Sequence, residues 1–276
     1  MKFGVSYSTA AQGMDPDRLI RFAQHAEASG FESFYVPEHL VLHPGAQVYG
    51  HELPTDLPFA DPLDLLTFVA AATSRIVLGT GVLLIPYRHP IVLAKRLATI
   101  DALSRGRMRL LTVGLGSLPG EAAAMGVDFA GRGRRADETI DALRLLWGGD
   151  ERGVDFNGVP VCVYPKPFGS DLLPIHVAGS SAAAARRAGR RGSGYFPGGA
   201  LTPEQRAARW ELVRSTAAEH GRDPDTMEYT RWGSIDADPS HVEALVAEGV
   251  TRLVVNPYGE DQLDQLSAFA SRHDLS

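Results

Sequence analysis

One tetrapeptide in this sequence has the residue types and the position of an anion-binding site. Ala178, Gly179, Ser180 and Ser181 end an apolar, strand-like run and begin a helix-like run. The first backbone N–H groups of a helix have no partner within it, and the helix dipole adds partial positive charge there. Two serine hydroxyls supply further donors. The pattern predicts a phosphate site, and it also fits plain N-capping by serine.

Glu38 and His39 form a second candidate group at the end of another strand-like run. Histidine is the side chain best suited to exchange protons near neutral pH, and an adjacent carboxylate can orient it. If the strand belongs to a parallel barrel, both residues lie at its mouth. A pair of this kind can instead cap a helix or anchor a loop, and the two residues alone do not separate these roles.

A glycine-rich turn with Gly114, Leu115 and Gly116 follows a third apolar run. The turn superficially resembles a dinucleotide-binding loop. Its glycines, however, are spaced G-x-G-x-x-x-G, and Pro119 interrupts the motif. We therefore expect a close approach of backbone to ligand here rather than a Rossmann site.

Strand-like apolar runs alternate with amphipathic helix-like runs along the whole chain. The expected strands are residues 2–7, 33–36, 76–84, 109–113, 174–178, 194–197, 228–235 and 251–256. The expected helices are residues 15–30, 90–103, 134–147, 180–189, 202–221, 238–249 and 261–271. Strict alternation indicates an α/β fold with a parallel sheet, and eight units in about 250 residues is the size of a (β/α)8 TIM barrel. The alternative, a doubly wound sheet, normally has a phosphate loop after its first strand, and the segment after Tyr7 is a poor one.

Two segments are longer than a minimal barrel requires, although residues 1–276 are expected to form a single domain. Residues 40–62, rich in Pro, Gly and His, follow the second strand, and loops of this length are usually functional. In a barrel they lie on the catalytic face, so we interpret them as an active-site loop. Residues 151–169 indicate a small hairpin inserted after the fourth helix. The hairpin starts on the opposite face, and we expect it to be structural.

Composition and charge limit the classes of function. The 276 residues carry a net charge of −6, which argues against nucleic acid as the main partner. The single cysteine, Cys162, excludes a disulfide framework, and the spacing of His43, His51 and His89 matches no metal motif. The longest apolar window, residues 76–86, is too short to span a bilayer, and the amino terminus has no signal-like apolar stretch. We expect a cytoplasmic protein that binds a small molecule and neither a metal nor a membrane.

Three stretches of the sequence resemble the luciferase-like monooxygenase superfamily. They are residues 75–110 (RIVLGTGVLLIPYRHPIVLAKRLATIDALSRGRMRL), 126–147 (GVDFAGRGRRADETIDALRLLW) and 174–196 (PIHVAGSSAAAARRAGRRGSGYF). Within the superfamily the chain is most similar to the oxidoreductases that use the deazaflavin coenzyme F420. The resemblance implies a luciferase-like TIM barrel with a flavin-like ring at the carboxyl ends of the strands. It also implies hydride transfer to or from a small organic substrate, and a homodimer.

The resemblance further implies roles for individual residues. Gly81 and Val82 would be joined by a non-proline cis peptide bond that backs one face of the ring. His39 would lie near the ring and move a proton, with Glu38 orienting it as the second catalytic residue. The cofactor-binding residues would be His39, Gly81, Val82, Gly114, Leu115, Gly116, Ala178, Gly179, Ser180 and Ser181. Apart from the resemblance, we expect Tyr49, Tyr87 and Arg88 to contact the substrate, because they lie in segments near the expected barrel mouth.

Two other functions stay open. An FMN-dependent luciferase-like monooxygenase would use O2 and reduced flavin from a partner reductase. FMN-binding luciferases place a phosphate-binding arginine near the turn that follows the fourth strand, where this chain reads Val113, Gly114, Leu115, so the turn favours F420. A non-catalytic barrel that binds a flavin-like ligand is the second alternative. We expect Arg132 to serve helix entry and salt bridging rather than ligand binding.

Overall fold

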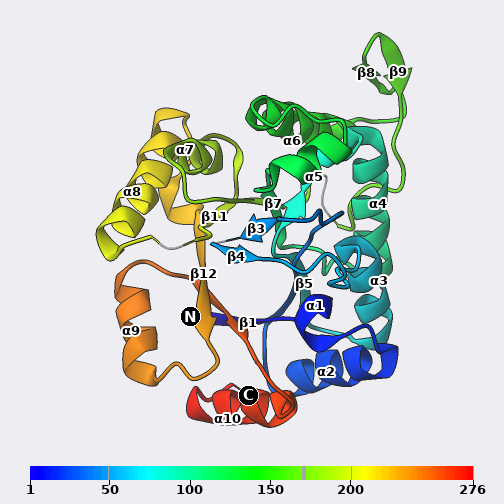
Figure 1. The fold of residues 1–276 in the computed structure, drawn as a ribbon. Coiled ribbons are helices and arrows are strands. Elements are labelled where there is room, and N and C mark those ends of the chain that lie inside the picture. Colours follow the sequence, from blue (N-terminus) through cyan, green and yellow to red (C-terminus); the bar gives the residue numbers. More distant parts are fainter. Residues whose placement is uncertain (49, 170–171, 200, 276) are drawn as a thin grey trace.

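A ring of parallel strands forms the centre of the molecule, and helices surround it (Figure 1). The computed structural model describes residues 1–48, 50–169, 172–199 and 201–275. Within these ranges one nine-stranded sheet has the order β5-β2-β1-β13-β12-β11-β10-β7-β6. Its strands are β1 Lys2–Ser6, β2 Ser33–Val36, β5 Val77–Thr80, β6 Leu83–Leu84, β7 Leu111–Gly114, β10 Ile175–Ala178, β11 Gly194–Phe196, β12 Glu228–Ser234 and β13 Arg252–Asn256.

Backbone hydrogen bonds between β5 and the residue before β7 close the sheet into a barrel. Leu110 N donates to Leu78 O at 3.2 Å, and Thr80 N donates to Leu110 O at 3.1 Å. β6 continues the third expected strand beyond Gly81 and pairs with β7 in parallel. β5 and β6 together therefore occupy one position in the ring. The predicted luciferase-like TIM barrel is confirmed.

Helices α2, α3 and α9 begin with the same Asp-Pro signal. Asp15, Asp61 and Asp238 each accept a hydrogen bond from a backbone N–H of the first helical turn, and the proline that follows suits the first helical position. Within the described ranges the α-helices are α1 Thr9–Gln12, α2 Pro16–Ala28, α3 Pro62–Ala72, α4 Pro90–Leu103, α5 Pro119–Ala124, α6 Arg132–Gly148, α7 Ala182–Arg191, α8 Pro203–Glu219, α9 Pro239–Ala247 and α10 Gln262–Arg272. Of these, α1, α3 and α5 were not predicted. None of the helices just named has both the length and the hydropathy needed to cross a bilayer.

Both insertions contain a short antiparallel hairpin. In residues 40–62 the strands β3 Gln47–Val48 and β4 His51–Glu52 pair, and Figure 1 draws them across the middle of the ring. In residues 151–169 the strands β8 Val154–Phe156 and β9 Val159–Val161 pair, which confirms the predicted hairpin. This second hairpin projects away from the body of the protein (Figure 1).

A partly buried ionic network lies at the amino-terminal ends of the barrel strands. Arg252 is 1% exposed and donates to Glu32 at 2.9 and 3.0 Å and to Glu228 at 2.5 Å. His176 Nε2 lies 3.6 Å from Glu228 Oε2. Burial lowers the pKa of His176 to about 4, and the carboxylates nearby offset only part of this effect. Although burial raises the pKa of Glu228, the hydrogen bond and charge of Arg252 outweigh it and lower that pKa to about 2.

We predict that His176 makes the fold less stable as the pH falls from about 7 to about 5. The unfolded chain takes up a proton near the ordinary pKa of 6.5, whereas the folded chain stays neutral until about 4. Because the unfolded state then binds more protons, the loss is about 2 kcal/mol over this interval. Urea denaturation at the two pH values measures it. The variant His176→Gln should show a flatter pH dependence, and an unchanged slope in this variant would refute the assignment.

Candidate active site

The carboxyl ends of the barrel strands surround a cavity of about 650 Å³. This volume falls in the range of about 300–1,000 Å³ that is common for small-molecule sites. All eleven residues assigned to catalysis or cofactor binding from the sequence line this one cavity. The sequence therefore predicted which residues gather at the barrel mouth, although what each one binds stays a prediction.

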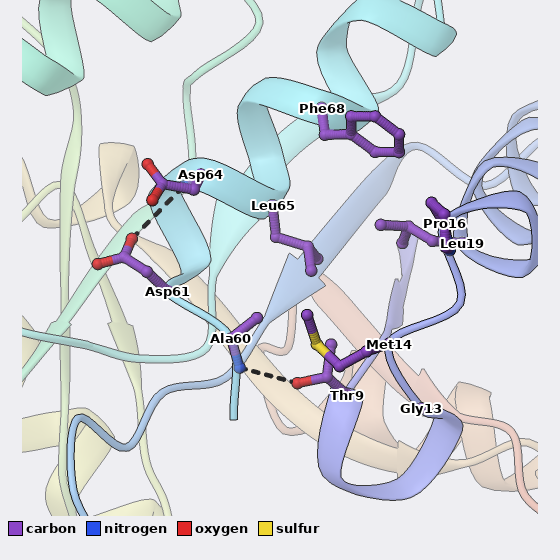
Figure 2. A pocket seen from close by; sticks show the side chains of 10 residues that line it. All are labelled: Thr9, Gly13, Met14, Pro16, Leu19, Ala60, Asp61, Asp64, Leu65 and Phe68. Atoms are coloured by element: carbon purple, nitrogen blue, oxygen red, sulfur yellow. Dashed lines mark hydrogen bonds between the residues drawn. The ribbon is translucent and has the colours of Figure 1, made fainter. Parts of the chain in front are cut away.

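A second cavity, of about 380 Å³, lies on the outside of the barrel between α2 and α3. Figure 2 shows Leu65 and Phe68 of α3 opposite Pro16 and Leu19 of α2. The lining is mostly apolar, and the carboxylate of Asp61 at its edge already caps α3. Since no predicted site residue lines this cavity, we place the candidate site at the barrel mouth.

Close backbone packing forms one wall of the site. The peptide bond between Gly81 and Val82 is cis, as the resemblance implied. A Cβ atom at Gly81 would lie 3.1 Å from the Trp232 ring, and one at Gly114 would lie 2.5 Å from Val82 Cγ2. Gly114 therefore leaves the space that the Val82 side chain fills, and a Cβ at Gly81 would fit only if the Trp232 ring shifted slightly. Trp232 and Phe196, whose ring centroids are 4.7 Å apart, extend the same wall into the barrel.

His39 is held by a carboxylate that the sequence analysis did not single out. Its Nδ1 lies 3.3 Å from Oε2 of Glu121, a fully buried residue of α5. The second oxygen of Glu121 accepts hydrogen bonds from Leu40 N at 2.7 Å and from Val41 N at 3.4 Å. The ring of Phe59 packs edge-on against His39 with a centroid distance of 5.0 Å. These contacts fix the imidazole plane at the edge of the cavity.

Glu38, expected to orient His39, is bonded elsewhere. Its carboxylate accepts a hydrogen bond from Leu84 N at 2.6 Å and two from the guanidinium of Arg88. Arg88 also donates to Asp61 at 3.0 Å. Burial lowers the pKa of Arg88, but hydrogen bonds and charges from both carboxylates outweigh it and raise that pKa. Arg88 therefore ties together the two ends of the loop that carries His39.

Two of the three expected substrate contacts, Tyr87 and Arg88, are not among the described residues that line the cavity. Arg88 is taken up by the ion pairs with Glu38 and Asp61. Tyr87 packs beneath Gly116, where any Cβ would overlap with the tyrosine hydroxyl. Tyr49 lies outside the described residues. The structure instead brings Val48, Leu53 and Phe59 of the 40–62 loop to the cavity.

Arg132 supplies a cation next to the glycine-rich turn. It is the first residue of α6, lines the cavity, and donates from Nε to Gly116 O at 3.2 Å. Its guanidinium lies 3.4 Å from the centroid of the Phe129 ring. The sequence analysis assigned Arg132 to helix entry and found no cation in the turn itself. Arg132 does begin α6, as expected, but its side chain also reaches the turn from that helix. The argument against FMN therefore becomes weaker.

The predicted phosphate site gains the first N–H groups of α7 but loses one hydroxyl and the N–H of Gly179, which donates to Phe196 O at 3.3 Å. Ser180 Oγ already donates to Gly198 O, and Ser181 Oγ accepts from Ala184 N at 3.1 Å as the N-cap of α7. The Ser181 hydroxyl proton is still available to a ligand. The N–H groups of Ala182 and Ala183 open the helix and have no partner inside it. An anion at this position would be held by these N–H groups, by Ser181 and by the dipole of α7.

The histidines of the loops do not gather around a metal position. His43 Nδ1 donates to Pro44 O at 3.0 Å, and His89 caps α4 by accepting from Ile91 N. His51 is exposed on the β3–β4 hairpin. Across the described ranges no group of three or more His, Cys, Asp or Glu side chains has an arrangement that could hold a metal ion.

We predict that replacing Arg88 strongly destabilises the fold. The change Arg88→Leu leaves the carboxylate of Glu38, whose side chain is fully buried, without its charged partner and with only the hydrogen bond from Leu84 N. Such a loss costs about 3–5 kcal/mol in the free energy of unfolding. The double variant Glu38→Gln with Arg88→Leu should be more stable than Arg88→Leu alone. Urea denaturation measures both, and a single variant within about 0.5 kcal/mol of the wild type would contradict the assigned pairing.

Comparisons with known proteins agree with this architecture. Residues 1–254 match the family model of the luciferase-like monooxygenases. An F420-dependent glucose-6-phosphate dehydrogenase of Beutenbergia cavernae is 31% identical over 258 residues, which cover 88% of this chain and 71% of that protein. The limonene 1,2-monooxygenase of Rhodococcus erythropolis is 30% identical over 216 residues, covering 76% of this chain but 52% of that enzyme. The chain thus spans about half the length of this last relative.

Two solved structures share the fold at low sequence identity. An F420-dependent secondary alcohol dehydrogenase in complex with an F420-acetone adduct superposes with a TM-score of 0.81 at 18% identity, covering 100% of this chain and 99% of that one. The monooxygenase RslO1 from Streptomyces bottropensis superposes with a TM-score of 0.80 at 22% identity, covering 99% and 98%. With a family model matched over most of its length, the chain belongs to the luciferase-like monooxygenase family.

Proposed function

We propose that this protein is a coenzyme F420-dependent oxidoreductase that transfers hydride between the deazaflavin and a small organic substrate. The observation that carries the proposal is the placement of His39. It lines the cavity with one ring nitrogen held by a buried carboxylate, and no described residue bonds the other. Hydride transfer to or from a carbon that bears oxygen needs a proton acceptor or donor there. The similarity to F420-dependent glucose-6-phosphate dehydrogenases supports the same choice.

The residues present fit a deazaflavin with an anionic tail. Backbone at Gly81 and Gly114 and the side chains of Val82, Phe196 and Trp232 form apolar walls for a flat ring. The N-terminus of α7 and Arg132 supply donors for a phosphate at the same cavity. When bound, the deazaflavin would supply a ring carbon that exchanges hydride in two-electron steps. The reduced deazaflavin reacts poorly with oxygen.

The chain itself contributes binding, orientation and proton transfer. His39 Nε2 takes the proton of a substrate hydroxyl as the adjacent carbon loses hydride, and it returns that proton in the reverse direction. The peptide between Gly81 and Val82, which lines the cavity, would back the ring. Val48, Leu53 and Phe59 cover the substrate from the 40–62 loop and exclude water.

The cavity favours an uncharged and largely apolar alcohol or carbonyl compound. The loop residues that reach it are apolar, and Arg132 is the one cation among the described residues that line it. That cation already bonds Gly116 O and stacks on Phe129. A substrate phosphate would lack a second charged partner. We propose a neutral substrate on this basis. The cytoplasmic location and the homodimer expected in the sequence analysis are separate parts of the proposal.

An FMN-dependent monooxygenase is the second candidate. Arg132 beside the glycine-rich turn could bind an FMN phosphate, and limonene 1,2-monooxygenase is among the relatives. This enzyme would require O2 and a partner reductase. A non-catalytic barrel would bind the ring without turnover.

We predict that the apoprotein binds oxidised F420 with a dissociation constant of about 1 μM or tighter and binds FMN at least about 10-fold more weakly. Ring fluorescence or absorbance during titration measures both. Tighter FMN binding would replace this proposal with the monooxygenase. Binding of neither ligand would refute the phosphate site at α7 as well.

We also predict that Arg132→Gln weakens F420 binding by about 10- to 100-fold, because it removes a charge-assisted hydrogen bond to the phosphate. Arg134→Gln is the matched control, since Arg134 lies two positions along α6, is 83% exposed and pairs with Glu138. Equal affinities of the two variants would exclude Arg132 from the anion site. Oxygen consumption during turnover, measured in parallel, would favour the monooxygenase.

A further inference from the structure

We infer that Glu121 is a positioning residue that fixes the tautomer of His39, so that Nε2 presents its lone pair to the cavity. The use made of that lone pair rests on the proposed function. The tautomer itself rests only on contacts within this chain. The sequence gives no hint of the pairing, because 82 positions separate the two residues.

The two oxygens of Glu121 have separate partners. Oε1 accepts from the backbone N–H groups of Leu40 at 2.7 Å and Val41 at 3.4 Å. Oε2 faces His39 Nδ1 at 3.3 Å. A carboxylate oxygen only accepts hydrogen bonds, so Nδ1 must carry the proton. In the neutral ring Nε2 is then unprotonated, which is the form that accepts a proton from a substrate.

Other titratable side chains near this pair do not bond His39 among the described residues. The His43 ring packs against Gly120, next to Glu121, and its Nδ1 donates to Pro44 O. Glu38, next to His39, forms an ion pair with Arg88. Burial and the charge of Glu121 raise the pKa of Tyr87, so its hydroxyl stays protonated, and Arg132 opposes this effect. Arg132 itself bonds Gly116 O. Glu121 is therefore the acid that bonds His39 directly.

The substitution Glu121→Gln separates this role from simple loop anchoring. The amide oxygen must stay on the backbone N–H groups of Leu40 and Val41, because an NH2 group there would place donors against donors. The NH2 group then faces His39 Nδ1 and can only donate to it. Nδ1 becomes an acceptor, and the ring proton moves to Nε2. The loop contacts are kept while the tautomer is reversed.

Nitrogen-15 NMR of the histidine rings tests the inference without any cofactor. The neutral ring of His39 in the wild-type protein should show a protonated Nδ1 and an unprotonated Nε2, and Glu121→Gln should reverse this pattern. The matched control is Glu27→Gln. Glu27 also accepts backbone N–H groups, from Ser74, Arg75 and Ile76, without a histidine partner. This control should leave His39 unchanged. A wild-type ring protonated on Nε2, or no reversal in Glu121→Gln, would overturn the inference.

Kinetics then connect the tautomer to turnover. Glu121→Gln should lower kcat for alcohol oxidation by about 100-fold or more, as expected for loss of a general base. The KM and the F420 dissociation constant should stay within about 3-fold, and the rise of rate with pH that reports His39 should disappear. A fall in thermal stability with an unchanged pH profile would show a structural role only. If the NMR reversal occurs but no F420-dependent turnover exists, the proposed function fails and the inference stands.

Discussion

Two buried carboxylates hold the start of the loop that leaves β2, and the geometry of the site depends on them. Glu38 binds Leu84 N and the guanidinium of Arg88, while Glu121 binds Leu40 N, Val41 N and the His39 ring. Burying a carboxylate is costly unless hydrogen bonds and charges compensate it. With both carboxylates compensated in this way, the contact with Glu121 orients the His39 ring. His39, which precedes the 40–62 loop, is therefore held in a defined orientation although a long loop follows it.

The two ends of the barrel have different tasks. At the amino-terminal end, Arg252, Glu32, Glu228 and His176 form a closed ionic network that contributes to stability. At the carboxyl end, ring nitrogens, helix N–H groups and glycine backbone stay accessible around the cavity. This division is general for TIM barrels, because the loops after the strands can vary while the loops before them keep the ring closed.

Local patterns predicted the fold well. Alternating strand and helix runs indicated the barrel, and the Asp-Pro signals marked helix starts. The helix α3 was missed because PLDLLTFVAAA is apolar on almost every side, so no periodic face stands out, although Asp61-Pro62 repeats the start signal of Asp15-Pro16. The hairpin β3–β4 is too short to leave a pattern. The residues that line the barrel-mouth cavity were predicted, whereas their hydrogen-bond and ion-pair partners were not.

Those partners arise from tertiary structure alone. Glu121 reaches His39 from α5, Arg132 reaches the turn at Gly116 from α6, and Arg88 spans from Glu38 to Asp61. Each contact joins positions far apart in the sequence, and no local spacing indicates it. The sequence analysis expected Glu38 to orient His39, its neighbour in the chain. In the barrel adjacent residues point in different directions, so Glu38 turns to Arg88 and leaves His39 to Glu121.

A crystal structure of the protein with oxidised F420 is the most direct measurement of the central claim. The account predicts the ring in the barrel-mouth cavity, backed by the peptide between Gly81 and Val82, with His39 Nε2 facing it and the phosphate on the N-terminus of α7. Electron density for the cofactor outside this cavity, or a ring bound with His39 turned away from Glu121, would contradict it.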